Sequence, residues 1–376
     1  MEEINKKTLK VISKDKSKQK EKKLADPVKV TIDEATRQMI IRAQELDIET
    51  VFDRAENMKP CNIGVQGTCC KNCAMGPCRL PLPKGGVEGE DNRKGLCGAT
   101  PNTIAARNFI RMIAGGAAAH SDHGRGVAEI FMTAARKETE AYKIKDTKKL
   151  LSIAPYFNVD TTVEIDGEER DRDIDEIAIE VGEKALNEWG KPEGELNYLK
   201  RAPEPLYAKW EKNGVLPRNI DREIVEIMHR THIGVDQDFR NLIKQGTRTA
   251  IADGWGGSMM ATDLQDVLFG TPYPLLSEAN LGVMKEDHVN IVIHGHEPIL
   301  SEMIVAVTQT KEIKDYAKSK GAKGIQLSGI CCTANEILQR HGVPLCGTFL
   351  QQELAIITGA CDAMVVDIQC IFQNVA

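Results

Sequence analysis

The chain has 376 residues, a formal net charge of −6 and a charged fraction of 28%, a balance that gives no sign of a nucleic-acid-binding protein. The hydrophobic fraction of 41% is typical of a globular protein, and the length allows two or three domains. No apolar run reaches the roughly 18 residues that a membrane span needs, and the basic N-terminus lacks the apolar core of a secretory signal. We therefore expect a cytoplasmic protein without disulfides.

The first part of the chain is predicted to be helical. Residues 1–28 are rich in lysine and predict a mobile basic tail. Between residues 29 and 250, apolar side chains recur at helical spacing and no convincing strand is found. We therefore predict a helical domain over residues 29–250, with helices over residues 33–57, 102–119, 127–142, 174–189 and 221–250.

The pattern changes after residue 250. Short apolar runs predict strands over residues 289–294, 324–330 and 363–368. They alternate with predicted helices over residues 299–319, 334–341 and 349–358. This alternation is typical of a parallel, doubly wound sheet. The predicted fold is thus a helical domain followed by a Rossmann-like α/β domain over residues 251–376.

The eleven cysteines fall into two groups, six between Cys61 and Cys97 and five between Cys331 and Cys370. The first group reads C61-x7-C69-C70-x2-C73-x4-C78-x18-C97. A zinc site usually takes two tight C-x2-C pairs, and this loop has only one. Iron–sulfur clusters accept looser spacing. We therefore favour an iron–sulfur loop over a zinc loop or a disulfide framework, with one complete set of four cysteines and one spare pair.

The second group contributes to a constellation that includes a histidine. His296, Cys332 and Cys370 each follow a predicted strand, with separations of 36 and 38 residues. One strand–helix–strand unit fills such a gap, so all three are expected at the carboxyl ends of parallel strands, where α/β sheets place ligands. A histidine and two cysteines there are credible ligands of a transition metal.

The segment CNIGVQGTCCKNCAMGPCRL, followed by GLCG, resembles the cluster loop of the nickel-containing carbon monoxide dehydrogenases. The resemblance implies a homodimer in which Cys61 and Cys69 hold a [4Fe–4S] cluster shared between two subunits. A second, internal [4Fe–4S] cluster is then held by Cys70, Cys73, Cys78 and Cys97.

The blocks HGHEP, GICCTANE and VVDIQC resemble the same family. They imply a nickel–iron–sulfur active-site cluster, with His296 and Cys332 on an outer iron and Cys370 on an iron of the cubane. The segment GGAAAHSDH implies that His120 is the acid–base histidine, and ADGWGG implies that Asp253 supports it. Of the two adjacent cysteines, the resemblance favours Cys332 over Cys331 as the ligand. His294 is expected to be a strand-end residue, and Cys346 and Cys361 are expected to serve packing.

The resemblance implies reversible oxidation of CO with water to CO2, with electrons passing through the [4Fe–4S] clusters to a ferredoxin-like acceptor. Acetyl-CoA synthase is a further candidate partner. The family continues beyond residue 376 and supplies further ligands there, so we expect a truncated chain that is inactive alone. Two alternatives stay open: a hybrid-cluster-type hydroxylamine reductase, and a non-catalytic iron–sulfur protein for electron transfer or assembly.

Overall fold

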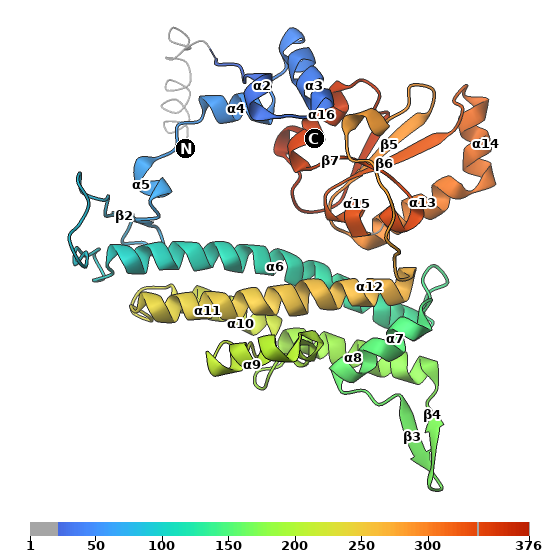
Figure 1. The fold of residues 1–376 in the computed structure, drawn as a ribbon, viewed down its shortest axis with the longest axis horizontal. Helices are drawn as coiled ribbons and strands as arrows, with labels where there is room; N and C mark the ends of the chain where they lie inside the picture. The colour runs from blue at the N-terminus through green and yellow to red at the C-terminus, as the bar shows by residue number, and fades with distance from the viewer. Residues whose placement is uncertain (1–21, 337, 376) are drawn as a thin grey trace, which may run out of the picture.

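The structure, a computed structural model, describes residues 22–336 and 338–375. Figure 1 shows a layer of long helices and, beside it, an α/β part that also carries the N-terminal helices. Most of the predicted basic tail, residues 1–21, lies outside the described residues. None of the described helices has the length and apolar character that crossing a membrane requires.

The N-terminal helices pack against the α/β part. They are α2 (Pro27–Val30), α3 (Glu34–Glu45) and α4 (Val51–Asn57). The sequence predicted one helix over residues 33–57, but the chain leaves α3 near Asp47, which has a φ of 55°, and restarts at Thr50. Thr50 and Asp53 form a capping box that begins α4. Arg42 Nε donates to the carbonyl of Ile357 at 2.9 Å, which joins α3 to the C-terminal part.

The helical layer is organised around α6 (Pro101–Ala135), which runs beside a second rod made of α11 (Phe239–Ile251), the π-helical η3 (Ala252–Met260) and α12 (Ala261–Phe269) (Figure 1). The prediction of separate helices over residues 102–119 and 127–142 was wrong, because the glycine pair at 115–116 lies inside α6. Glycine costs a helix only about 1 kcal/mol, and the alanine-rich flanks of this pair, buried on one face, offset that cost. The second rod extends past the predicted division at residue 250.

Shorter elements complete the helical layer. In place of the single helix predicted over residues 221–250, the structure has two helices, α10 (Ile220–Arg230) and α11. The remaining elements are α5 (Asn62–Val65), α7 (Thr147–Ile153), η1 (Ala154–Phe157), α8 (Ile174–Gly190), η2 (Asn197–Arg201) and α9 (Glu204–Lys212). The largest buried apolar cluster lies between α6, α8, α12 and their neighbours, and includes Phe131, Phe157, Tyr198 and Leu264.

The expectation of no strand before residue 250 was wrong. The two-residue strands β1 (Cys69–Cys70) and β2 (Cys78–Arg79) lie within the cysteine-rich loop. An exposed hairpin of β3 (Thr162–Ile165) and β4 (Glu168–Asp171) projects from the helical layer (Figure 1). It turns at Asp166-Gly167, both with positive φ, which is a strong hairpin signal in sequence.

The C-terminal part is a four-stranded parallel sheet in the order β7-β6-β5-β8. The three predicted strands are confirmed as β5 (Val289–His294), β6 (Ile325–Ile330) and β8 (Ala363–Val366), and the short β7 (Leu345–Gly347) was missed. The remaining elements are η4 (Leu281–Val283), α13 (Pro298–Gln309), α14 (Lys311–Ser319), α15 (Cys332–Glu336), η5 (Leu338–His341), η6 (Phe349–Gln351), α16 (Gln352–Ile357) and η7 (Gln373–Val375). The predicted combination of a helical part and a parallel α/β part is therefore confirmed.

Candidate metal centres

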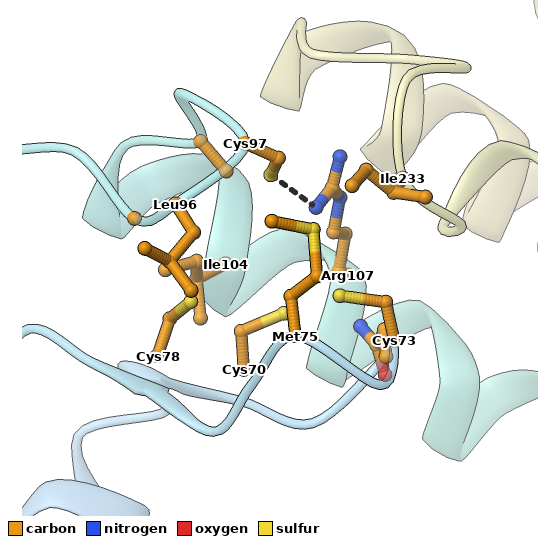
Figure 2. Close-up of a pocket in the computed structure, with 12 residues that line it drawn as sticks. Cys70, Cys73, Met75, Cys78, Leu96, Cys97, Ile104, Arg107 and Ile233 are labelled. Carbon is orange, nitrogen blue, oxygen red and sulfur yellow. Dashed lines mark hydrogen bonds between the residues drawn. The ribbon is translucent and has the colours of Figure 1, made fainter.

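Four cysteines of the N-terminal loop line one pocket beside α6 (Figure 2). Cys70 of β1 pairs with Cys78 of β2 in a short antiparallel ladder, and Cys73 lies in the turn between them. Cys97 comes from the loop that precedes α6. These are the four cysteines that the sequence analysis grouped as one complete set.

The wall of this pocket is mostly apolar, and includes Met75, Leu96, Ile104 and Ile233 (Figure 2). Gly95 also lines the pocket, and the absence of a side chain there leaves room for Cys78. A Cβ on Gly95 would lie 3.3 Å from Cys78 Cβ and 3.4 Å from Cys78 Sγ. The loop thus approaches the thiols closely, within a wall that limits access of water.

The side chain of Arg107 reaches this pocket from α6. It is 1% exposed, and its guanidinium donates to Cys97 Sγ at 3.8 Å and to the carbonyl of Asp236 at 3.2 Å. Two N–H groups among the pocket residues, Arg107 Nε and Asn72 Nδ2, are buried with no hydrogen-bond partner in the described part of the chain. Buried donors normally have partners, so these two fit an anionic group of thiolates and sulfides, as in an iron–sulfur cluster.

The protonation of Cys97 agrees with a ligand role. Burial raises the pKa of this thiol, but hydrogen bonds from the Ala99 backbone and from Arg107 outweigh burial, so the pKa is lowered overall. The thiolate is the form of cysteine that binds metals.

A zinc site and an iron–sulfur cluster differ in how closely they bring their ligands together. Among residues 22–336 and 338–375, no three His, Cys, Asp or Glu side chains approach closely enough to hold a single metal ion. Zinc needs its ligands at about 2.0–2.3 Å from one centre, whereas a four-iron cluster takes one thiolate at each iron and leaves its ligands farther apart. All described cysteines are free of disulfides.

Cys61 and Cys69 lie outside the four-cysteine pocket. Cys61 is exposed at the start of α5, and Cys69 is half-buried in β1. The pKa of the Cys61 thiol is lowered by backbone hydrogen bonds from Gly64 and Ile63. The spare pair is thus at or near the surface, as a cluster shared with a second subunit requires.

The second constellation assembles at one edge of the sheet. Strands β6, β5 and β8 are neighbours and parallel, so the prediction that His296, Cys332 and Cys370 follow the ends of adjacent strands is confirmed. His296 and Cys332 line one cavity together with His120, and Cys370 Sγ lies 3.9 Å from His296 Nε2. Cys331 and Cys370 both have positive φ, a backbone conformation that non-glycine residues adopt mainly where the surroundings enforce it.

Asp367 fixes the backbone of the His296 segment. Its carboxylate accepts the amide of His296 at 2.7 Å and the amide of Glu297 at 2.8 Å. A Cβ on Gly295 would lie 1.4 Å from Asp367 Oδ1, so only glycine leaves room for this carboxylate. His296 Nδ1 lies 3.2 Å from the carbonyl of Ile368, which orients the ring as expected for a metal-ligating histidine whose other nitrogen is hydrogen-bonded.

His120 and Asp253 are brought together across the helical layer. His120 Nδ1 lies 2.8 Å from Asp253 Oδ1, although 133 residues separate them. A Cβ on Gly124 would lie 2.7 Å from the carbonyl of Gly257, so glycine on α6 allows the close approach of η3. Asp253 lies in this π-helical segment, a distortion that is frequent at functional sites.

The sequence reasoning assigned no site role to two residues that lie at these sites. His123 is buried, hydrogen-bonds Gln265 at 3.1 Å, and lines the cavity beside His120 and His296. Burial and the neighbouring histidines lower the pKa of His123 to about 4, so the ring is neutral at pH 7. Its three-residue spacing from His120 was the available signal, and Arg107 gave none because arginine in a helical run is ordinarily read as a surface residue.

The histidine and cysteines that the sequence analysis left out of the ligand set differ in their surroundings. His294 and Cys346 are fully buried, and His294 Nε2 lies 3.1 Å from Gln352 Oε1. Cys361 is half-buried. Burial raises the pKa of the Cys331 thiol to about 12, with Cys370 adjoining it.

Three comparisons with known proteins bear on both sites. The sequence profile of the Prismane/CO dehydrogenase family matches residues 68–376. Carbon monoxide dehydrogenase 1 of Methanosarcina acetivorans is 52% identical over 346 residues, which cover 92% of this chain and 53% of that protein. The beta subunit of the Moorella thermoacetica carbon monoxide dehydrogenase/acetyl-CoA synthase is 42% identical over 350 residues, 92% of this chain and 50% of that protein.

A solved structure is also similar. The nickel-free crystal structure of carbon monoxide dehydrogenase from Thermococcus sp. AM4 matches with a TM-score of 0.86 and 49% sequence identity, covering 94% of this chain and 54% of that one. The chain thus spans about half the length of the curated relatives it matches.

Proposed function

Because the chain belongs to the Prismane/CO dehydrogenase family, we propose that it is the part of an anaerobic nickel–iron–sulfur carbon monoxide dehydrogenase that carries the electron-transfer clusters and one side of the active site. The reaction is CO + H2O ⇌ CO2 + 2H⁺ + 2e⁻. The observation that carries the proposal is the convergence of His296, Cys332 and Cys370 at the ends of adjacent strands, in front of His120. We place the protein in the cytoplasm.

The active-site cluster, when bound, would supply the metal ions at which CO and water react. In this chain His296, Cys332 and Cys370 would hold it, and Asp367 holds the backbone that presents His296. Cys332 is preferred to Cys331 because it lines the cavity with His296 and His120.

His120 is the group that accepts the proton released from water. Its Nδ1–H donates to the carboxylate of Asp253, which leaves Nε2 as the acceptor. Asp253 thereby fixes the tautomer and stabilises the imidazolium, so it is a positioning residue. In the assembled enzyme, His120→Gln is expected to lower turnover roughly 10²-fold, and Asp253→Asn to lower it less, with unchanged iron and nickel content. Wild-type turnover in His120→Gln would reject this role.

Cys70, Cys73, Cys78 and Cys97 would hold an internal [4Fe–4S] cluster, and Cys61 and Cys69 would share a second cluster with another subunit. When bound, these clusters would supply the path for electrons. A ferredoxin-like protein is the acceptor, and acetyl-CoA synthase is a second candidate partner. Cys61→Ser with Cys69→Ser should remove about four iron atoms per dimer and weaken dimerisation. Cys361→Ser, which lies outside both cysteine sets, is the matched control. Unchanged iron in the double variant would contradict the shared cluster.

The experiment that tests the whole proposal supplies the rest of the active site. The chain is produced anaerobically with iron, sulfide and nickel, either alone or together with the C-terminal half of the Methanosarcina acetivorans relative. We expect iron but no stoichiometric nickel in the chain alone, and nickel uptake with CO-dependent reduction of a viologen dye in the pair. Iron without nickel in both preparations would favour the electron-transfer or hybrid-cluster alternatives.

A further inference from the structure

Arg107 is a buried cation that forms no ion pair with a carboxylate within residues 22–336 and 338–375. It ranks among the largest fully buried side chains, at 1% exposure. Its hydrogen-bond acceptors are Cys97 Sγ and the backbone carbonyl of Asp236. Arginine cannot lose its proton in proteins, and a buried charge is costly unless it is paired. The compensating negative charge is therefore expected from the Cys97 thiolate, together with the group that the four cysteines hold.

The direction of the guanidinium points to the same conclusion. Figure 2 shows it beside Cys97, in the wall of the pocket that the four cysteines line. Within the described part of the chain, Arg107 Nε has no hydrogen-bond partner, and neither does Asn72 Nδ2 on the same pocket. Two buried donors from different elements, one on α6 and one in the cysteine loop, are thus available to sulfur atoms in the pocket.

We propose that Arg107, assisted by Asn72, is the positioning residue that balances the charge of the cluster held by Cys70, Cys73, Cys78 and Cys97 and raises its reduction potential. This inference rests on the proposed function, since it assumes an iron–sulfur cluster there. Four thiolates make a [4Fe–4S] cluster anionic, and one-electron reduction adds a further negative charge. A fixed cation at close range stabilises the reduced state more than the oxidised state, so its removal makes reduction harder.

The alternative is a purely structural role. Arg107 also ties α6 to the loop before α11 through the carbonyl of Asp236, and loss of that tie would lower stability without changing a potential. The reduction potential therefore separates the two roles, and the charge-retaining Arg107→Lys separates charge from shape.

The experiment uses the full chain, purified anaerobically after incorporation of iron and sulfide, in a background of Cys61→Ser and Cys69→Ser that leaves only the internal cluster. Iron and sulfide are quantified, and the cluster is titrated with dithionite while its paramagnetic resonance signal is followed. Arg107→Met should lower the equilibrium constant of one-electron reduction about tenfold, equivalent to about 59 mV. Arg107→Lys should retain most of the wild-type value, and Asn72→Leu should shift it in the same direction by a smaller factor.

Arg111 provides the matched control. It lies one turn along α6, donates from Nε to Thr231 Oγ1 at 2.8 Å, and does not line the pocket. Arg111→Met removes the same charge from the same helix and should leave the potential unchanged. A wild-type potential in Arg107→Met, or an equal shift in Arg111→Met, would overturn the inference.

Two further outcomes are decisive. If Arg107→Met keeps its helical circular dichroism but loses iron, while Arg107→Lys keeps iron, the charge is needed to hold the cluster and the proposal stands. If Arg107→Lys loses iron as completely as Arg107→Met and Asn72→Leu has a wild-type potential, the charge argument is wrong. Absence of any cluster in the parent chain would instead refute the proposed iron–sulfur function.

Discussion

The contact between Gly295 and Asp367 yields a prediction whose size can be worked out from the structure. Gly295 has a φ of +143°, and a Cβ there would lie 1.4 Å from Asp367 Oδ1 and 2.3 Å from Asp367 Cγ. Gly295→Ala must therefore displace the carboxylate that accepts the amides of His296 and Glu297. Each charge-assisted hydrogen bond is worth about 1.5–3 kcal/mol, and the unfavourable φ adds about 1–3 kcal/mol. We expect a loss of about 4 kcal/mol or more in the free energy of unfolding.

Gly321→Ala is the control for the backbone part of this cost. Gly321 has a φ of +98°, and no heavy atom lies within 4 Å of a Cβ built on it. The two variants are compared by denaturant unfolding and by hydrogen exchange of the His296 and Glu297 amides, which should lose protection only in Gly295→Ala. Adding Asp367→Gly to Gly295→Ala should remove the clash but not restore those amides. If Gly295→Ala and Gly321→Ala were equally stable, the reasoning from this steric contact would be refuted.

Two further predictions concern buried charges in the helical layer. Lys149 Nζ lies 2.6 Å from Asp263 and 3.1 Å from Asp266, so Lys149→Met should cost about 3 kcal/mol of unfolding free energy in denaturant titrations; a loss under about 1 kcal/mol would contradict this. Burial raises the pKa of Glu223. Hydrogen bonds from Arg218 and from the buried Gln245 outweigh that effect, so the pKa of Glu223 is lowered below its usual 4.5. The stability from Glu223 is then present above pH 4.5 and lost as the pH falls through the lower folded value. The difference in melting temperature between wild type and Glu223→Gln should shrink below pH 4.5, and a constant difference between pH 7 and pH 3 would refute it.

The positions of the metal-site residues were largely predictable from sequence. Cysteine spacing separated a set of four from a pair, and the set of four lines one pocket. Strand periodicity placed His296, Cys332 and Cys370 after neighbouring strands, because parallel strands end at a common edge. Whether these residues hold the clusters stays a prediction that the metal analyses address.

What the sequence could not supply are contacts between distant segments. Nothing local distinguishes Arg107 from a surface arginine, or shows that Gly295 makes room for Asp367, 72 residues away. The hairpin at residues 162–171 was missed because its strands are only four residues long and the second, Glu168–Asp171, contains no apolar residue that could alternate with its polar ones. The continuity of α6 was missed because the glycine pair at 115–116 was given more weight than the alanines around it.

That continuity has a functional consequence under the proposed assignment. Arg107 and His120 lie on one helix, 13 residues apart by subtraction of their numbers, so about 20 Å of helix axis separates the internal cluster pocket from the acid–base histidine. The sheet is held to the same helix, since Gln369 Nε2 donates to the carbonyl of Ala119 at 2.8 Å. A break at the glycine pair would uncouple these positions, whereas an unbroken helix sets the internal cluster, the proton acceptor and the ligand-bearing strand ends at fixed separations. Such rigidity is what electron and proton transfer from one reaction centre would require of the scaffold.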